Sequence, residues 1–413
     1  MKTLLIIGHI FPEPTTTAAG TRMMQLISLF EKEKYKIVFS STASITNKSE
    51  TFKSTSVEVK SIVLNNVSFD NFIKELNPSV VLFDRFITEE QFGWKVAENC
   101  PDAMRLLDTE DLHFLRKARQ ETLKKKLPLS DLNLFSDAAK REIASMYRCD
   151  LSLIISEFEM KLLKNTFHID TSLLCYLPFL VHEIAEAEFN KFPLFENRNH
   201  FISIGNFLHA PNLDSILFLK KEIWPEIKKE LPKAELHIYG AYAPQQILEL
   251  HSKKEGFLIK GWIANVSEVM KNARVCLAPL RFGAGLKGKF IDAMKNGTPA
   301  VTTAIGSEGI SGNFSFSGAI ANDVEGIVNA SIALYNNKEN WLAAQQNAMI
   351  ILSQRFNYNL YSEKFIDQLI QLQNTLDAHR KQNFTGQILQ HQSVHATKYM
   401  GKWIEQKNKT TNK

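Results

Sequence analysis

The sequence predicts an α/β protein made of two doubly wound domains that face each other across a cleft. Short apolar runs alternate with segments of helical spacing, which is the pattern of a parallel sheet covered on both faces. The alternation stops in a polar stretch at 183–199 and then starts again. The chain has 413 residues, more than one hydrophobic core usually fills. We therefore expect two sheets of the same kind, joined by a linker.

The first predicted domain covers 1–182. Segments with helical spacing lie at 21–33, 89–99 and 137–147. The apolar runs between them predict strands at 3–8, 36–40, 57–64, 79–83, 104–108, 151–156 and 173–178.

The second predicted domain covers 200–355, after the linker at 183–199. Helices are expected at 213–229, 244–253, 324–335 and 340–354. Its predicted strands are 201–205, 235–240, 257–263, 275–280 and 299–303. The remainder, 356–413, is predicted to be a helical return segment followed by a basic tail.

Composition and charge exclude several classes of protein. With 44% hydrophobic and 23% charged residues, the chain has the composition of a soluble globular protein. The four cysteines lack CxxC spacing, which is typical of buried free thiols in a reducing cytosol. The apolar start MKTLLIIGHIF is too short for a signal peptide or a membrane span. The net charge of +5 is concentrated in the tail from Arg380, so a nucleic-acid groove is not indicated.

The segment 281–310 carries the most specific chemistry. It reads RFGAGLKGKFIDAMKNGTPAVTTAIGSEGI, a glycine-rich basic loop that leads into a helix. Gly283 and Gly285 allow amide groups to approach an anion. Lys287 and Lys289 add charge at the positive end of the helix dipole. About one turn later, Asp292 is placed to accept hydrogen bonds from sugar hydroxyls, so the segment predicts a site for a nucleotide-linked diphosphate.

Two loops of the first domain follow carboxyl ends of strands, where ligands bind in open parallel sheets. The loop after the first strand places Ala19, Gly20 and Arg22 at a helix start, suited to an anion or to a turn capped by Thr21.

The strand at 104–108 runs into the acidic cluster Asp108, Glu110, Asp111 and His113. These side chains suit orientation of a sugar and an acceptor hydroxyl. Metal ligation is the competing use, but no second cluster completes a metal site, and Asp108 or Thr109 could also simply cap a helix.

In sum, the stretch VCLAPLRFGAGLKGKFIDAMKNGTPAVTTAIGSEGI resembles the donor-binding signature of retaining glycosyltransferases of family 4 (group 1), which have the GT-B fold of two Rossmann-like domains. In that family the helix offers two glutamates eight residues apart. Asp292 takes the later place, which contacts the ribose, and Ala284 the earlier one. The chain resembles a subgroup in which Gly-x-Gly and basic residues replace the first carboxylate. Where the family carries His-Asp, this chain has Glu110-Asp111.

The resemblance implies a role for each of these positions. Glu110, Asp111 and Lys289 would be catalytic. Acceptor contacts would come from Ala19, Gly20, Arg22 and His113. Donor contacts would come from Gly205, Asn206, Trp262, Ile263, Arg281, Gly283, Ala284, Gly285, Lys287, Asp292 and Glu308. The loop 206–215 lacks the usual Arg and Lys, so Arg281, Lys287 and Lys289 would carry the phosphate charge.

The implied activity is transfer of a sugar from a nucleotide-sugar to an acceptor hydroxyl with retained configuration, in synthesis of a bacterial polysaccharide or glycoconjugate. The resemblance implies that no metal and no cofactor is needed, and the missing Asp-x-Asp motif is consistent with this. A nucleotide-sugar 2-epimerase and a non-catalytic GT-B subunit that supports a partner enzyme are the alternatives. The expected partners are the donor and a glycan, lipid-linked or small-molecule acceptor, with no nucleic acid.

The basic tail leaves two interpretations open. Residues 395–407 place Tyr399, Met400, Trp403 and Ile404 on one helical stripe. The stripe suits packing on the first domain, as is usual in GT-B proteins, or contact with an anionic membrane. The expected location is cytoplasmic, with peripheral contact at the inner face of the membrane in the second case.

Overall fold

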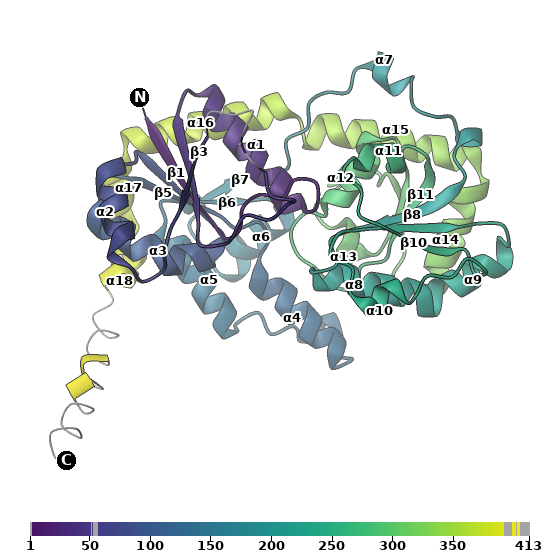
Figure 1. Ribbon diagram of the computed structural model, residues 1–413, viewed down its shortest axis with the longest axis horizontal. Coiled ribbons are helices and arrows are strands. Elements are labelled where there is room, and N and C mark those ends of the chain that lie inside the picture. The colour runs from purple at the N-terminus through teal and green to yellow at the C-terminus, as the bar shows by residue number, and fades with distance from the viewer. Residues whose placement is uncertain (1, 51, 53–56, 392–398, 402, 405–413) are drawn as a thin grey trace.

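The computed structural model describes residues 2–50, 52, 57–391, 399–401 and 403–404. It contains two parallel sheets, each covered by helices, in two lobes that lie side by side (Figure 1). The predicted fold class is therefore confirmed. The first sheet is formed by strands between Thr3 and Tyr176, and the second by strands between His200 and Ile320.

The first sheet has seven strands in the order β3-β2-β1-β4-β5-β6-β7, and every pairing is parallel. Alternate residues of β1 supply the cores on its two faces, because successive strand side chains point to opposite sides. Leu4 and Ile6 join one core, and Leu5 and Ile7 the other. The strands are β1 (Thr3–Gly8), β2 (Lys36–Ser41), β3 (Glu58–Ser61), β4 (Val80–Asp84), β5 (Met104–Asp108), β6 (Leu151–Ile154) and β7 (Leu174–Tyr176).

The second sheet has six strands in the order β10-β9-β8-β11-β12-β13, again all parallel. Its last strand, β13, was not expected from the sequence, because three residues that begin with a glycine give no apolar run. The strands are β8 (His200–Ile204), β9 (Leu236–Tyr239), β10 (Phe257–Gly261), β11 (Ala273–Ala278), β12 (Ala300–Thr302) and β13 (Gly318–Ile320).

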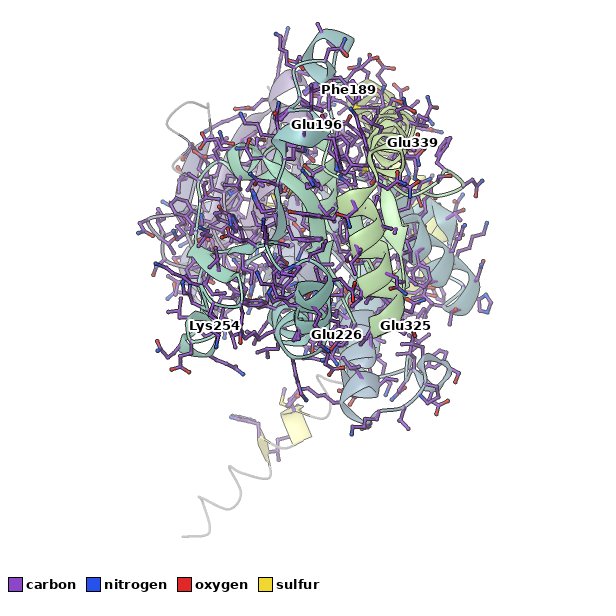
Figure 2. All side chains as sticks on the ribbon, turned by 90° about the vertical axis from the view of Figure 1, so that its right-hand side faces the viewer. Phe189, Glu196, Glu226, Lys254, Glu325 and Glu339 are labelled. Atoms are coloured by element: carbon purple, nitrogen blue, oxygen red, sulfur yellow. The ribbon has the colours of Figure 1, made fainter. Side chains whose placement is uncertain are left out.

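Helices cover both faces of each sheet. In the first lobe they are α1 (Ala18–Lys32), α2 (Val67–Leu76), α3 (Arg85–Asn99), α4 (His113–Lys124), α5 (Asp137–Arg148) and α6 (Glu157–Thr166). In the second they are α8 (Ala210–Phe218), α9 (Trp224–Glu230), α10 (Gln245–Leu248), α11 (Val266–Met270), α12 (Gly288–Lys295), α13 (Ala304–Ser307), α14 (Val324–Asn336) and α15 (Lys338–Arg355). The short α7 (Glu186–Phe189) lies in the linker, where Phe189 stands at the edge of the molecule (Figure 2).

The chain crosses between the lobes twice, and the crossings pair with each other. The Val181 amide donates to the Phe356 carbonyl oxygen at 2.7 Å, and the Tyr358 amide donates to the Val181 carbonyl oxygen at 2.9 Å. After the second crossing, α16 (Tyr358–Asn374), α17 (Leu376–Gln382) and α18 (Phe384–His391) return to the first lobe. Phe365 and Leu369 of α16 complete the core on one face of the first sheet.

Arg380 fastens the returning chain to the first lobe. Its guanidinium donates to both Asp150 carboxylate oxygens at 2.7 Å and to the Ala103 carbonyl oxygen at 2.7 Å. The Asp150 side chain is 3% exposed. Loss of the Arg380 guanidinium would therefore leave the buried negative charge of Asp150 less compensated.

We expect Arg380→Ala to lower the free energy of unfolding by about 2 kcal/mol. Urea denaturation followed by circular dichroism measures the change. The neighbouring Lys381→Ala removes an exposed cation and should change stability by less than about 0.5 kcal/mol. Equal stability of the two variants would contradict the role given to Arg380.

The predicted tail helix at 395–407 lies partly outside the described residues. Among its described positions, Tyr399, Met400, Trp403 and Ile404 are exposed by 46% to 62%. No helix in the described part of the chain is long and apolar enough to cross a membrane.

Candidate functional site

A cleft of about 790 Å³ opens between the lobes, within the range of small-molecule sites. Loops that follow the carboxyl ends of strands from both sheets line it, as expected for open parallel sheets. Among the predicted site residues, the lining includes Ala19, Glu110, Asp111, His113, Gly205, Asn206, Trp262, Ile263, Gly283, Ala284, Lys287, Lys289 and Asp292.

The glycine-rich loop forms the cationic wall of the cleft. Gly283 and Gly285 have φ values of +156° and +61°, which residues with a Cβ rarely adopt. The loop leads into α12, whose first turn contains Lys289. The Lys287 ammonium donates to the Gly285 carbonyl oxygen at 3.0 Å, and the Lys289 ammonium donates to Asn212 Oδ1 at 2.8 Å.

Burial lowers the pKa of Lys287 and of Lys289 to about 8. Both groups are therefore still mainly cationic at pH 7, but neither has a carboxylate bonded to it in the described part of the chain. Two poorly compensated ammonium groups at a helix N-terminus form a site for a multiply charged anion.

Asp292 lies one turn further along α12 and also lines the cleft. Burial raises the pKa of its carboxyl to about 6. The carboxylate is half-buried and faces the same space as the lysines. It is thus placed to accept hydrogen bonds from hydroxyl groups of a ligand in the cleft.

The acidic loop after β5 forms the opposite wall. Glu110 has a φ of +61°, which is rare for a residue with a side chain and turns the loop toward the cleft. Burial, with the nearby Asp108 charge, raises the pKa of Glu110 well above its usual value. Burial opposes ionisation of Asp111 too, but Arg116 and His113 lower its pKa to about 2. Ionisation is thus disfavoured at Glu110 and favoured at Asp111.

His113 begins α4 at the edge of the acidic loop. Its Nδ1 lies 3.3 Å from Glu142 Oε1 and 3.8 Å from Asp111 Oδ1. The His113 amide also donates to Glu142 at 3.1 Å, so a buried carboxylate on α5 fixes the start of α4.

The loops after β8, β9 and β10 form the far end of the cleft. Trp262 is 42% exposed, and its indole N–H donates to the Thr15 carbonyl oxygen at 3.1 Å. The Tyr242 hydroxyl reaches across the cleft and donates to the Glu13 carboxylate at 2.9 Å. Gly205 and Asn206 lie between this end and the basic loop.

Five predicted site residues do not line the cleft. Two of them are glycines, and each of the other three is paired with a carboxylate or a guanidinium elsewhere. Arg22 is buried, and its Nε donates to Asp108 Oδ1 at 2.9 Å. Arg281 forms a two-pronged ion pair with Asp214 at 2.9 and 2.5 Å. Of the three cations predicted to hold phosphate, only Lys287 and Lys289 therefore line the cleft, and Arg22 is paired inside the first lobe.

Glu308 is the third of these residues. It accepts two hydrogen bonds from Arg119 of α4, at 2.7 and 2.9 Å, and so joins the lobes. Gly20 lies in a small side pocket where Glu13 leaves no room for a Cβ. The Gly285 amide points away from the cleft, because it donates to Glu159 Oε1 at 2.8 Å.

Several residues that shape the site were missed by sequence reasoning. Glu13, Tyr242 and Asn212 line the cleft, and Arg119 and Glu159 hold its two walls together. A positive φ of +59° at Tyr242 sets its direction, which no sequence pattern indicates. Within the described residues, no group of three or more His, Cys, Asp or Glu side chains is placed to hold a metal ion.

Two facing Rossmann-like lobes with a cationic, glycine-rich loop in the cleft define a GT-B protein. Residues 198–337 match the family described as Glycosyl transferases group 1. This match bears out the resemblance to group 1 glycosyltransferases over these residues, and the likeness to solved structures bears out the fold.

Similar solved structures include the sucrose-phosphate synthase of Thermosynechococcus elongatus, with a TM-score of 0.68 and 13% identity over 90% of this chain and 99% of that one. Another is HepE of Anabaena in complex with UDP and glucose, with a TM-score of 0.64 and 12% identity over 90% of this chain and 100% of that one. At these identities the likeness shows the fold.

One curated relative is an uncharacterized 44.6 kDa protein in the cps region of Klebsiella pneumoniae. It is 29% identical over 157 residues, which are 36% of this chain and 39% of that protein. The chain thus matches well under half of that relative's length.

Proposed function

We propose that the protein is a retaining glycosyltransferase that moves a sugar from a nucleotide-sugar to an acceptor hydroxyl, in synthesis of a bacterial surface polysaccharide or glycoconjugate. The observation that carries this proposal is the cationic loop with Lys287 and Lys289 at the start of α12, followed by Asp292 in the same cleft. The UDP and glucose bound by HepE and the cps-region relative support it.

The roles of the two walls follow from their charges. The lysines and the positive end of α12 stabilise the diphosphate as negative charge develops on it, which lowers the barrier to departure. Asp292 holds the ribose of the nucleotide. The acidic loop, with Glu110, Asp111 and His113, positions the sugar and the acceptor hydroxyl.

The charge states of the acidic loop favour a same-face mechanism. Burial raises the pKa of Glu110 and so disfavours the charged form that a nucleophile needs, and the Asp111 carboxylate is held by an ion pair with Arg116. Neither group is thus suited to form a covalent sugar intermediate. The leaving phosphate itself would take the proton from the acceptor hydroxyl, so that no separate base, metal or cofactor is required.

A panel of nucleotide-sugars tests the function. The purified protein is expected to bind at least one of them by calorimetry and to transfer or slowly hydrolyse its sugar. Binding without turnover would favour the non-catalytic subunit. Conversion of the donor to its 2-epimer would favour the epimerase.

We expect donor affinity to depend on pH in a bell-shaped manner. Asp292, with a pKa of about 6, becomes negatively charged as the pH rises. It then accepts hydrogen bonds from hydroxyl groups more strongly. Lys287 and Lys289, with pKa values of about 8, lose charge at higher pH. Affinity should therefore rise from pH 5 to 7 and fall above pH 8, as measured by calorimetry.

Asp292→Asn should remove the acidic limb of this profile and weaken binding at pH 7 by about tenfold, the effect of one charge-assisted hydrogen bond. The exposed Asp367→Asn serves as the matched control and should keep the full profile. An unchanged acidic limb in Asp292→Asn would assign that limb to another group.

A further inference from the structure

Helix α4 carries two arginines about one turn apart, and each is paired with an acid beside the cleft. Arg116 forms an ion pair with Asp111 of the acidic loop. Arg119 lies three residues later and reaches the other lobe, where its Nη2 donates to Glu308 Oε1 at 2.7 Å and its Nη1 to Glu308 Oε2 at 2.9 Å. The first lobe therefore supplies the cation that neutralises Glu308 of the second lobe.

The same guanidinium also lies against the basic loop of the donor site. Arg119 Nη1 donates to the Gly283 carbonyl oxygen at 2.7 Å. The Lys287 side chain lies beside this glycine too, since its Cε is 3.6 Å from the point where a Cβ on Gly283 would stand. Arg119 and Lys287 thus lie against one residue of the loop, although they belong to different lobes.

The segments that carry Lys287 and Glu308 pack directly on each other. A Cβ on Gly309, which follows Glu308, would lie only 2.9 Å from Cδ2 of Leu286, which precedes Lys287. The Glu308 side chain is 14% exposed, and a carboxylate with so little solvent needs a cation nearby. Lys287 is therefore within reach as an alternative partner for Glu308.

The charges around Lys287 support this alternative. Burial has the largest effect on the Lys287 pKa and lowers it. Among the neighbouring charges, Glu308 has the largest effect and raises this pKa, Arg119 lowers it, and Glu159 and Asp111 raise it to a smaller extent. Glu308 is thus the carboxylate with which Lys287 would pair if Arg119 did not hold it.

We propose that Arg119 is a positioning residue that holds Glu308 away from Lys287 and so keeps the Lys287 ammonium available to a phosphate of the donor; the last step rests on the proposed glycosyl transfer. The guanidinium fork engages both oxygens of Glu308. The Lys287 ammonium is left to donate to a neutral group, the Gly285 carbonyl oxygen at 3.0 Å. A lysine paired with a carboxylate would attract a phosphate only weakly, because the two charges cancel.

Titration of Lys287 in the full chain without any ligand tests this role. NMR of protein labelled with 13C in its lysine side chains measures the pKa, and the Lys287→Arg variant assigns the signal. Arg119→Met should raise the pKa of Lys287 above its wild-type value of about 8, because Glu308 is released to pair with it. Adding Glu308→Gln should lower the pKa again. An unchanged pKa in Arg119→Met would overturn the proposal.

Calorimetry with UDP, GDP and ADP tests the consequence for binding. For the tightest of the three, Arg119→Met should weaken binding about tenfold or more. The double variant Arg119→Met/Glu308→Gln should return to within about threefold of the wild type, and so should Arg119→Lys, which can still pair with Glu308. The contact with Gly283 is lost in the single and the double methionine variant alike, so recovery in the double variant separates the withholding of Glu308 from support of the loop.

Lys117→Met, on the exposed face of α4, is the matched control and should keep the wild-type affinity. Thermal unfolding followed by circular dichroism verifies that each variant is folded, and the double variant leaves no unpaired charge at this position. Equal binding by Arg119→Met and the wild type, or no recovery in the double variant, would overturn the proposal. If the wild type binds none of the three nucleotides, the proposed function fails, and the titration of Lys287 still decides the role of Arg119.

Discussion

Replacing Lys289 by methionine is expected to lower the rate of glycosyl transfer about 100- to 1,000-fold, the usual effect of removing one preorganised group that stabilises developing charge. The ammonium group lies in the cleft at the first turn of α12, and Asn212 Oδ1 fixes it at 2.8 Å. Methionine keeps most of the length of the unbranched side chain and removes its charge. The leaving diphosphate would then lose its contact at the helix N-terminus.

The measurement is a comparison of kcat and KM for the best donor. A group that acts mainly on the leaving charge should lower kcat, while a group that only binds the donor should raise KM. Lys271→Met, on the exposed surface of the same lobe, is the control and should retain full activity. A Lys289→Met variant with unchanged kcat would limit this residue to ground-state binding.

The fold was predictable because both of its sheets have strong local patterns. Buried parallel strands such as β1 and β5 are continuous apolar runs, so their bounds at Thr3–Gly8 and Met104–Asp108 were predicted to the residue. Strand β3 was predicted too long, at 57–64. It is an edge strand with exposed residues, and the apolar run used to predict it also included residues of the following turn. Helix α2 was missed, and α4 was anticipated only as a helix start capped by Asp108 or Thr109, since the polar exposed faces of both helices hide a narrow buried stripe.

The candidate site was predictable where one segment forms it alone. The basic loop and Asp292 lie within one stretch of sequence, and the structure brings Lys287, Lys289 and Asp292 into one cleft. Arg22 and Arg281 were assigned to ligands because they lie in the right loops. Their partners Asp108 and Asp214 lie 86 and 67 residues away in the sequence, and no local pattern shows that they meet.

Contacts between the lobes were the least predictable. Glu13 accepts hydrogen bonds from Tyr242 at 2.9 Å and from Thr46 at 2.7 Å, and it joins segments 229 residues apart. Burial opposes ionisation of Glu13, but the hydroxyls of Thr46, Thr16 and Tyr242 lower its pKa. Such a contact depends on how the two separate sheets are oriented relative to each other. The sequence periodicity of either sheet gives no information about that orientation.

Glu159 is the most deeply buried link between the two walls of the cleft. Its side chain is fully buried on α6, and Oε1 accepts from the Leu112 amide at 2.9 Å and from the Gly285 amide at 2.8 Å. One carboxyl thereby ties the acidic loop to the basic loop. Its Oε2 has no hydrogen-bond partner among the described residues, so a negative charge on it is poorly compensated. Burial, with the nearby Asp111 charge, raises the pKa of Glu159 from 4.5 to about 8.

This raised pKa predicts that stability falls as the pH rises from about 5 to 8. In that window the folded state keeps a proton on Glu159 that the unfolded chain releases. The free energy of unfolding is therefore highest at the acidic end of the window and falls as the pH approaches 8. The loss is on the order of 4 kcal/mol for a shift of this size. Urea denaturation at a series of pH values measures it.

Glu159→Gln should remove this slope, because the neutral amide keeps an oxygen for both backbone donors and has no proton to lose. The variant should match the wild type at about pH 5 or below and be clearly more stable at pH 9. Glu159→Ala should instead be less stable than Glu159→Gln by about 2 kcal/mol or more at every pH, since it leaves two buried amides without an acceptor. Glu121→Gln, on an exposed position of α4, controls for the lost carboxyl. If Glu159→Gln keeps the wild-type slope, the proton is bound elsewhere, and Glu159 joins the two loops as a charged group.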